Sequence, residues 1–130
     1  MEVRVDLAQI VISENREPQL IVLRERDGER HLPIVIGLHE AHAIDRRVKG
    51  VALPRPLTHD LLANVVEQLG AEMEKIVIND IQDGTFFAKL VIRQGGELVE
   101  VDSRPSDAIA LGVATEVPIY VEDHVLGQVV

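Results

Sequence analysis

The stretch QLIVLRERDGERHLPIVIG (residues 19–37) places two runs of β-forming residues on either side of Asp27-Gly28. An Asp-Gly pair supplies the positive φ angles of a tight turn, so this stretch predicts a β-hairpin. Pro33 lacks the amide that a sheet ladder needs, which predicts a position at a strand start, an edge or a bulge. An antiparallel sheet is therefore the starting point for the fold.

Further strands follow from the same signals. The runs EKIVINDI (74–81) and TFFAKLVIR (85–93) flank Asp83-Gly84, and LVEVD (98–102) follows Gly95-Gly96. Together they predict a three-stranded meander. Three further segments are expected: a strand over Val3 to Ile12, a buried strand at PIYV (118–121), and an edge strand or docking tail at VLGQVV (125–130).

Three segments have helical periodicity. The first runs from Leu38 to a stop at Gly50, and the third begins near Ser103 to Asp107 and covers AIALGVA (108–114). The second is expected to begin at Thr58 as N-cap and to end at Gly70. Its apolar stripe is Leu61, Leu62, Val65, Val66 and Leu69. The pattern predicts an α+β fold with an antiparallel or mixed sheet built from hairpins. About three helices pack mainly on one face of that sheet, in a single domain over residues 1–130.

The amino-acid composition indicates the kind of cellular compartment. The chain has 130 residues, a net charge of −9, no cysteine and only three aromatic side chains. The absence of cysteine excludes disulfides, thiolate metal sites and a cysteine nucleophile, and it fits a reducing compartment. The start, MEVRVDLAQIV, does not resemble a signal peptide, and no window approaches the ~18 consecutive apolar residues of a membrane helix. We expect a cytoplasmic protein with no membrane partner.

Acidic residues concentrate in the second half of the chain. Residues 1–66 carry 9 basic and 10 acidic side chains, a balance of −1, and residues 67–130 carry 4 basic and 12 acidic ones, a balance of −8. Because nucleic-acid binding depends on phosphate neutralisation and stacking, this composition weighs against a broad nucleic-acid surface. The exception is DRRVKGVALPRP (45–56), where Arg46, Arg47, Lys49 and Arg55 face one acid, Asp45. This run either ends a solvated helix or guides a nucleic-acid strand.

Two helix starts combine Arg-Pro with a hydroxyl residue and an aspartate: PRPLTHDLL (54–62) and DSRPSDAIAL (102–111). Capping by Thr58, and by Ser103 or Ser106, explains part of this pattern. The arginines lie at the unfavourable end of the helix dipole, so they require acidic partners or an external anion. If both starts face one edge, a single pocket collects Arg55, Thr58, His59 and Asp60 beside Asp102, Arg104, Ser106 and Asp107. Such a pocket suits a phosphate and a hard divalent cation.

The sequence contains few other signs of chemistry. HEAH (39–42) places its histidines three positions apart, whereas metalloprotease helices use four, and no third zinc ligand is evident. We therefore expect His39 and His42 to be solvent-exposed helix residues. There is no nucleophile elbow, phosphate loop or dinucleotide fingerprint.

Four segments resemble the bifunctional nuclease domain family of bacteria and plants. In order, they are LPIVIGLHEAHAI (32–44), PRPLTHDLL (54–62), DGTFFAKL (83–90) and DSRPSDAIALGVATEVPIYV (102–121). The resemblance implies an α+β domain that forms homo-oligomers, with the DNase and RNase activity reported for some members. The residues that it carries over are Glu40, Arg55, Thr58, His59, Asp60, Asp102, Arg104, Ser106 and Asp107. Two positions depart from the family: Phe87 stands where Tyr is frequent, and Ala114 stands where Arg is expected.

The resulting hypothesis is a divalent-metal-dependent nuclease that hydrolyses phosphodiester bonds of DNA or RNA with Mg²⁺ or Mn²⁺. Asp60, Asp107 and His59 are the expected catalytic residues. Arg55, Arg104, Thr58 and Ser106 are expected to bind substrate, and Asp60, Asp102 and Asp107 to hold the metal. One alternative is a non-catalytic oligomeric binding or regulatory module whose Arg–Asp motifs are structural. The other is a small-anion sensor that uses the same pocket.

Overall fold

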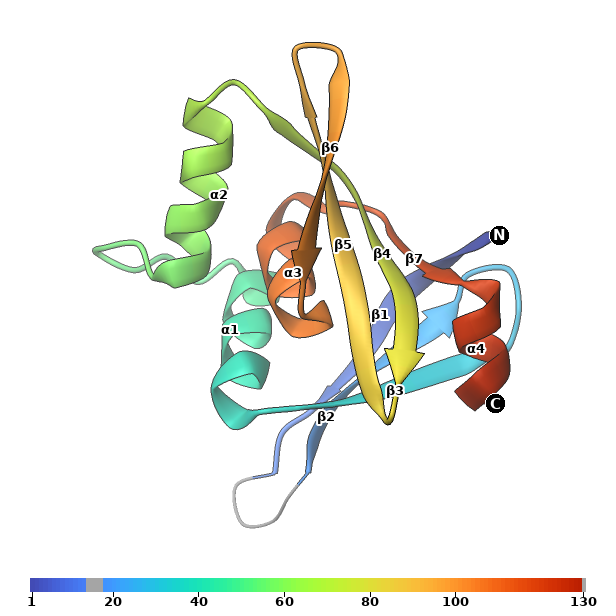
Figure 1. Cartoon of the computed structure of the whole chain (residues 1–130). Coiled ribbons are helices and arrows are strands. Elements are labelled where there is room, and N and C mark those ends of the chain that lie inside the picture. Colours follow the sequence, from blue (N-terminus) through green and yellow to red (C-terminus); the bar gives the residue numbers. More distant parts are fainter. Residues whose placement is uncertain (14–17, 130) are drawn as a thin grey trace.

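The computed structural model describes residues 1–13 and 18–129 and shows a seven-stranded mixed sheet over this range (Figure 1). The strand order is β3-β2-β1-β7-β4-β5-β6. The strands are β1 (Glu2–Val11), β2 (Gln19–Glu25), β3 (His31–Ile36), β4 (Glu72–Gln82), β5 (Thr85–Gln94), β6 (Glu97–Ser103) and β7 (Ile119–Glu122). The expected α+β architecture is confirmed.

Two antiparallel meanders make up most of the sheet. The first is β1–β2–β3 and the second is β4–β5–β6, and β7 lies between them. This strand pairs antiparallel with β1 and parallel with β4, so it joins the two meanders into one sheet. Pro33 lies on the edge strand β3, as its missing amide predicts.

The two Asp-Gly turns differ. Asp83 and Gly84 both adopt positive φ, at 50° and 78°, which confirms the tight turn between β4 and β5. The prediction of positive φ at Asp27-Gly28 is wrong, because neither residue adopts it. The strands β2 and β3 are joined by a longer connection over residues 26–30. The Glu25 amide donates to the Arg30 carbonyl at 2.9 Å and closes this connection. A loop of this length reverses the chain without residues at positive φ.

Four helices complete the fold: α1 (Leu38–Lys49), α2 (Thr58–Gln68), α3 (Pro105–Gly112) and α4 (Asp123–Val129), with the 3₁₀ turn η1 (Val113–Thr115) after α3. Seven of the eight residues of α3 are buried against the sheet and α1. Of the two alternatives expected over residues 125–130, the edge strand is wrong, because this segment belongs to α4, which docks on the sheet; residue 130 lies outside the described range. Val125 and Leu126 are adjacent and both fully buried, whereas a strand would point them to opposite faces.

The helix starts differ from the expected caps. Leu57 and Arg104 are the N-cap residues of α2 and α3, and neither Thr58 nor a serine caps through its side chain. Instead, Asp60 in the first turn of α2 accepts the Leu57 amide at 2.9 Å. This carboxylate satisfies a free helix amide as a capping box does, so no hydroxyl cap is needed. The stop at Gly50, with φ of 66°, is confirmed.

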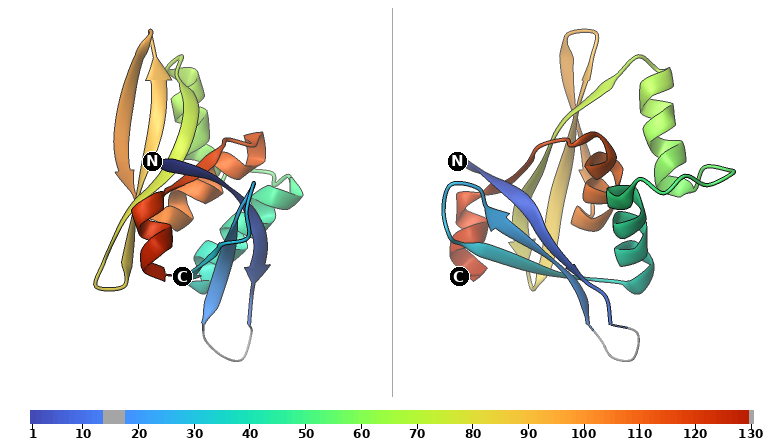
Figure 2. Two further views of the ribbon diagram at one scale, coloured as in Figure 1. Left: turned by 90° about the vertical axis from the view of Figure 1, so that its right-hand side faces the viewer. Right: turned by 180° about the vertical axis from the view of Figure 1, so that it is seen from behind.

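Helix α2 buries none of its residues. Figures 1 and 2 show it at the same end of the molecule as the turn between β5 and β6. There the Gln94 side chain donates to the Leu69 carbonyl at 3.1 Å. Of the helices described, none is both long and apolar enough to span a membrane.

Candidate functional site

A cleft of about 680 Å³ opens where α1, α2 and the β6–α3 junction meet. We call it the main cleft. Its floor is apolar, from Leu62, Leu90, Val101 and Leu111. Its polar lining is His39, Glu40, Thr58, His59, Asp102, Ser103, Arg104 and Asp107. The cleft therefore receives polar residues from both Arg-Pro helix starts.

A chain of polar contacts runs through the main cleft. His59 Nε2 lies 3.0 Å from Asp107 Oδ1. Arg104 donates from Nε to Asp107 Oδ2 at 2.9 Å and from its terminal NH2 group to Oδ1 at 3.2 Å. The same NH2 group lies 3.5 Å from Glu40 Oε2. The first turns of three helices are thus joined by four side chains.

The contact with Asp107 fixes which nitrogen of His59 is basic. Burial raises the pKa of Asp107, but hydrogen bonds from Arg104 and His59 outweigh it and leave this pKa below its ordinary value. Asp107 is therefore a carboxylate at neutral pH and only accepts hydrogen bonds. His59 Nε2 must carry the proton, and Nδ1 is left as a proton acceptor. No described residue forms a hydrogen bond with Nδ1.

Arg104 keeps donors for an external anion. Its side chain is 63% exposed, and its contacts with Asp107 and Glu40 use only Nε and one terminal nitrogen. The two N–H groups of the other terminal nitrogen have no partner among the described residues. Asp107 raises the pKa of Arg104 further above its already high value, so the guanidinium stays charged. The free donors suit a phosphate oxygen.

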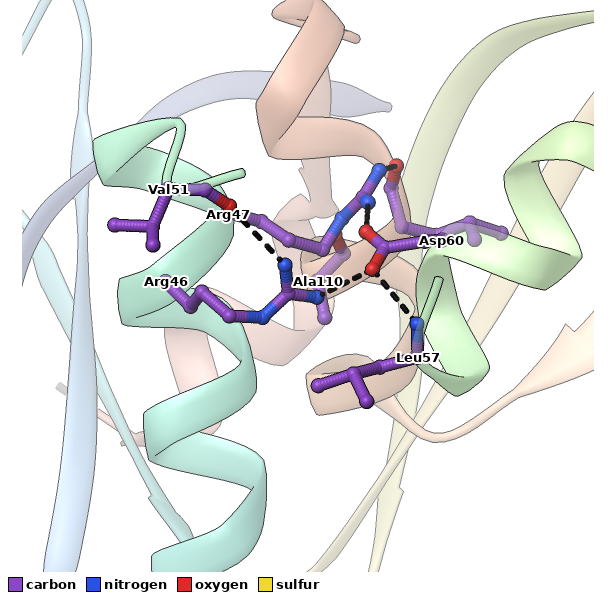
Figure 3. A network of polar contacts seen from close by, with 7 residues as sticks. Arg46, Arg47, Val51, Leu57, Asp60 and Ala110 are labelled. Carbon is purple, nitrogen blue, oxygen red and sulfur yellow. Dashed lines mark hydrogen bonds and ion pairs between the residues drawn. The ribbon is translucent and has the colours of Figure 1, made fainter. Parts of the chain in front are cut away.

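Asp60 does not line the main cleft. Its carboxylate points toward Arg46 and Arg47 (Figure 3). Its carboxylate accepts hydrogen bonds from Arg46 at 2.9 Å, from Arg47, and from the Leu57 amide. Arg47 also donates to the carbonyls of Ala110 at 2.5 Å and Leu111 at 3.1 Å. Burial raises the pKa of Asp60, and the Leu57 amide and the two arginines outweigh it and lower this pKa overall. Asp60 thus connects α2 to α1 and, through Arg47, to the end of α3.

The remaining predicted site residues lie in different places. Thr58 and Asp102 line the main cleft beside His59 and Asp107. Ser106 lines a neighbouring cleft instead. Arg55 lies in the exposed connection before α2, lines neither cleft, and has no hydrogen-bond or ion-pair partner among the described residues. The structure therefore brings the two helix starts together but does not place Arg55 beside Arg104.

The basic run at residues 45–56 is largely paired within the protein. Arg46 and Arg47 contact Asp60, and Lys49 lies 3.0 Å from Asp45. The sequence pattern did not reveal that these arginines are the partners of Asp60, because the pair spans thirteen residues and two helices. It also passed over His39 as a residue of the main cleft, although the adjacent Glu40 was selected.

The three carboxylates expected to hold a metal do not form one donor set. Asp60 is saturated by its arginines, and both oxygens of Asp107 accept hydrogen bonds from Arg104 or His59. Asp102 lines the main cleft, and Asp60 does not. Within the described residues, no group of three or more His, Asp or Glu side chains is arranged to hold a metal ion. The arrangement does not fit a preformed metal site.

Comparisons with known proteins agree with the motifs. A model of the family described as "Bifunctional nuclease domain" matches residues 21–130. An uncharacterised protein of Mycobacterium tuberculosis is 42% identical over 127 residues, which is 98% of this chain and 74% of that protein. Bifunctional nuclease 2 of Oryza sativa subsp. japonica is 31% identical over 114 residues, which is 85% of this chain and 35% of that protein. Bifunctional nuclease 2 of Arabidopsis thaliana is 29% identical, covering 80% of this chain and 33% of that protein.

Proposed function

The chain belongs to the bifunctional nuclease domain family, and we propose that it is a nuclease that cleaves DNA or RNA in the main cleft. The single observation that carries this proposal is the contact chain of His59, Asp107 and Arg104 on the wall of the cleft. It combines a proton acceptor with a cation that still has free donors. Hydrolysis of a phosphodiester needs both functions.

The chemistry assigned to each group follows from its contacts. His59 accepts a proton at Nδ1 from a water molecule, whose oxygen forms the new bond to phosphorus as the bond to the leaving sugar oxygen breaks, and the sugar oxygen takes a proton from solvent. Asp107 orients the imidazole and stabilises its protonated form. The free terminal nitrogen of Arg104 donates to a non-bridging phosphate oxygen and offsets the charge that develops there.

Dependence on Mg²⁺ or Mn²⁺ stays a prediction. The described carboxylates do not form a metal site, so no step of the proposed reaction is assigned to an ion. The roles proposed for His59, Asp107 and Arg104 do not depend on a metal ion, so cleavage is measured both with and without one.

The test is cleavage of labelled single-stranded DNA and RNA with Mg²⁺, with Mn²⁺ and with a chelator. His59→Asn is compared with the parent, and both are purified in parallel to control for contaminating nucleases. We expect the parent to cleave and His59→Asn to be ~10²–10⁴-fold slower. Equal rates would show that the cleavage comes from a contaminant or from another site.

An assembly role is the second candidate function, and the exposed face of α2 favours it. This α2 face consists of Leu57, Leu61, Leu62, Val65 and Leu69, each between 43% and 67% exposed. Val99 and Val101 of β6, at 44% and 41%, extend it across the main cleft, where Leu62 and Val101 share the lining. We propose that a second copy of this chain covers this face.

The size and shape of the α2 face support a second copy. Together with Val99 and Val101, its exposed fractions amount to about 350 Å² of apolar surface, if burying one whole aliphatic side chain removes roughly 100 Å². A standard interface buries roughly 800 Å² per partner, about 60% of it apolar. Leu61, Val65 and Leu69 form one row at four-residue spacing, which can pack against its own two-fold copy. Because each copy carries a charge of −9, apolar burial has to drive the association.

A further inference from the structure

A second cleft lies next to the main cleft. This side cleft of about 380 Å³ is bounded by β3, the β4–β5 turn and the start of α3. Glu40 and Arg104 line both clefts, so the two hollows open on either side of this ion pair. A chain molecule that contacts Arg104 in the main cleft can therefore continue into the side cleft.

One end of the side cleft has unused hydrogen-bond donors. Ser106 is only 6% exposed, lines the cleft, and its hydroxyl has no hydrogen-bond partner among the described residues. The unpaired side-chain atoms that are sealed from solvent in the described range are Arg4 Nε and Asn79 Oδ1, so the Ser106 hydroxyl still reaches the solvent of the cleft. A hydroxyl that faces a cleft and has no internal partner is available to donate to a ligand atom in place of water.

The backbone at the start of α3 adds donors of the same kind beside the side cleft, which Ser106 lines, whereas Asp107 lines the main cleft. Pro105 has no amide proton, and the Ala108 amide already donates to the Arg104 carbonyl at 3.1 Å. The amides of Ser106 and Asp107 remain without a partner in the described part of the chain. Free amides at a helix start, a hydroxyl and the Arg104 guanidinium form a combination that binds phosphate.

Apart from Glu40 and Thr85, the other side chains that line the side cleft are apolar. Ile34 and Ile36 of β3 contribute aliphatic surface, and half-buried Phe86 of β5 contributes one of the three aromatic rings in the chain. Thr85 adds a hydroxyl at the rim. A cleft with phosphate donors at one end and an aromatic wall is within the size range of small-ligand sites, ~300–1,000 Å³.

We propose that the side cleft is a nucleotide subsite for a single-stranded substrate. A phosphate of the strand binds to Ser106, the free amides of α3 and Arg104, and the adjoining base packs against Phe86. The inference rests on the proposed function for the identity of the strand, and it deepens that function by selecting single strands. A base held in a Watson–Crick pair cannot enter the side cleft without leaving its stack.

The experiment measures binding and does not depend on cleavage. Inorganic phosphate and uridine 5′-monophosphate are titrated into the full chain, and amide shifts in a ¹⁵N NMR spectrum report the site. We expect both ligands to shift the Ser106 and Asp107 amides. Ser106→Ala should weaken both ligands by about tenfold, because it removes a hydrogen bond to a charged group.

Phe86→Leu tests the base. It should weaken the nucleotide by about tenfold and leave inorganic phosphate unchanged, because only the stacking contact is lost. Leucine keeps the packing against the core that an alanine would remove. Phe87→Leu is the matched control, since the neighbouring ring points to the other face of β5 and does not line the side cleft.

The outcomes separate this inference from the proposed function. Amides of Ser106 and Asp107 that do not respond to either ligand would overturn the subsite even if the protein cleaves nucleic acid. Equal nucleotide affinity for Phe86→Leu and Phe87→Leu would overturn the position of the base. Specific nucleotide binding in a protein that does not cleave any strand would support the subsite and contradict the nuclease. A duplex that binds as tightly as its component single strand would overturn the selection of single strands.

Discussion

The starts of α2 and α3 carry nearly the same residues but use them differently. At α2, Asp60 is 21% exposed and contacts Arg46 and Arg47, whose side chains are 17% and 9% exposed. At α3, Asp107 faces the main cleft, and its partner Arg104 is 63% exposed. One aspartate therefore holds a helix in place, and the other holds a histidine and an arginine at a surface open to ligands.

The difference shows which arginines are structural. A partly buried ion pair with several hydrogen bonds is costly to break, whereas an exposed pair contributes little to stability. The hypothesis that the Arg–Asp motifs are structural therefore applies to Asp60. The hypothesis that they are functional applies to Asp107 and Arg104. The following predictions separate the two aspartates and the helices that they begin.

Asp107→Asn should have the largest effect, and the effect should be on activity. The amide removes the charge that orients His59 and stabilises its protonated form, so we expect cleavage to slow by ~10²–10⁴-fold. The free energy of unfolding should change by less than about 1 kcal/mol, because the pair with Arg104 is exposed. Single-turnover cleavage and urea denaturation measure the two quantities on one preparation. A large loss of stability would place Asp107 in the same class as Asp60.

Asp60→Asn should act mainly on stability. It leaves Arg46 and Arg47 without their carboxylate partner, so we expect the free energy of unfolding to fall by about 3 kcal/mol. The matched control is Asp45→Asn, which removes an (i, i+4) pair with the 64% exposed Lys49 and should cost less than about 0.5 kcal/mol. Equal costs for the two variants would contradict the anchoring role of Asp60.

Charges on the α2 face should weaken self-association. The double variant Leu61→Lys, Leu69→Lys replaces two side chains of the proposed contact and should cost about 2–3 kcal/mol of association free energy. Asn64→Lys, Gln68→Lys adds the same formal charge on the same helix outside the apolar row and is the control. Analytical ultracentrifugation of both variants gives the comparison. A parent that sediments as a monomer at high concentration would refute the second copy.

The smallest expected effect is on the pH dependence of stability, because the two aspartates are protonated in acid. Their pKa values lie below the ordinary value of 3.8 in the folded protein, so the stabilisation is present above that pH and is lost as the pH falls through the folded-state pKa. We expect the stability of Asp60→Asn to depend less on pH below about 4 than that of the parent. Parallel curves for the two proteins in that range would show that Asp60 is not protonated on unfolding.

Local patterns predicted most strands and three helices, because each depends on neighbouring residues, but they missed α4 and the form of the turn at Asp27-Gly28. Asp83-Gly84, Gly50 and Pro33 all lie where their backbone preferences require. The pairing of Asp60 with Arg47 was not predictable, since it depends on how α1 and α2 cross. For the same reason, the apolar stripe of α2 did not tell whether the helix covers a core or an interface, because the sequence pattern is the same for both. The contact between His59 and Asp107 was expected only on the condition that the two helix starts meet.

The position of β7 has a consequence for how the protein forms during synthesis. The strand that completes hydrogen bonding for both β1 and β4 is encoded at residues 119–122, after every other strand. Until it leaves the ribosome, the two meanders are separate sheets, each with an unpaired edge that can bind another nascent chain. Closure of the sheet is therefore a late event of high contact order. We expect a translation arrest before residue 119 to leave an aggregation-prone intermediate that a chaperone must hold.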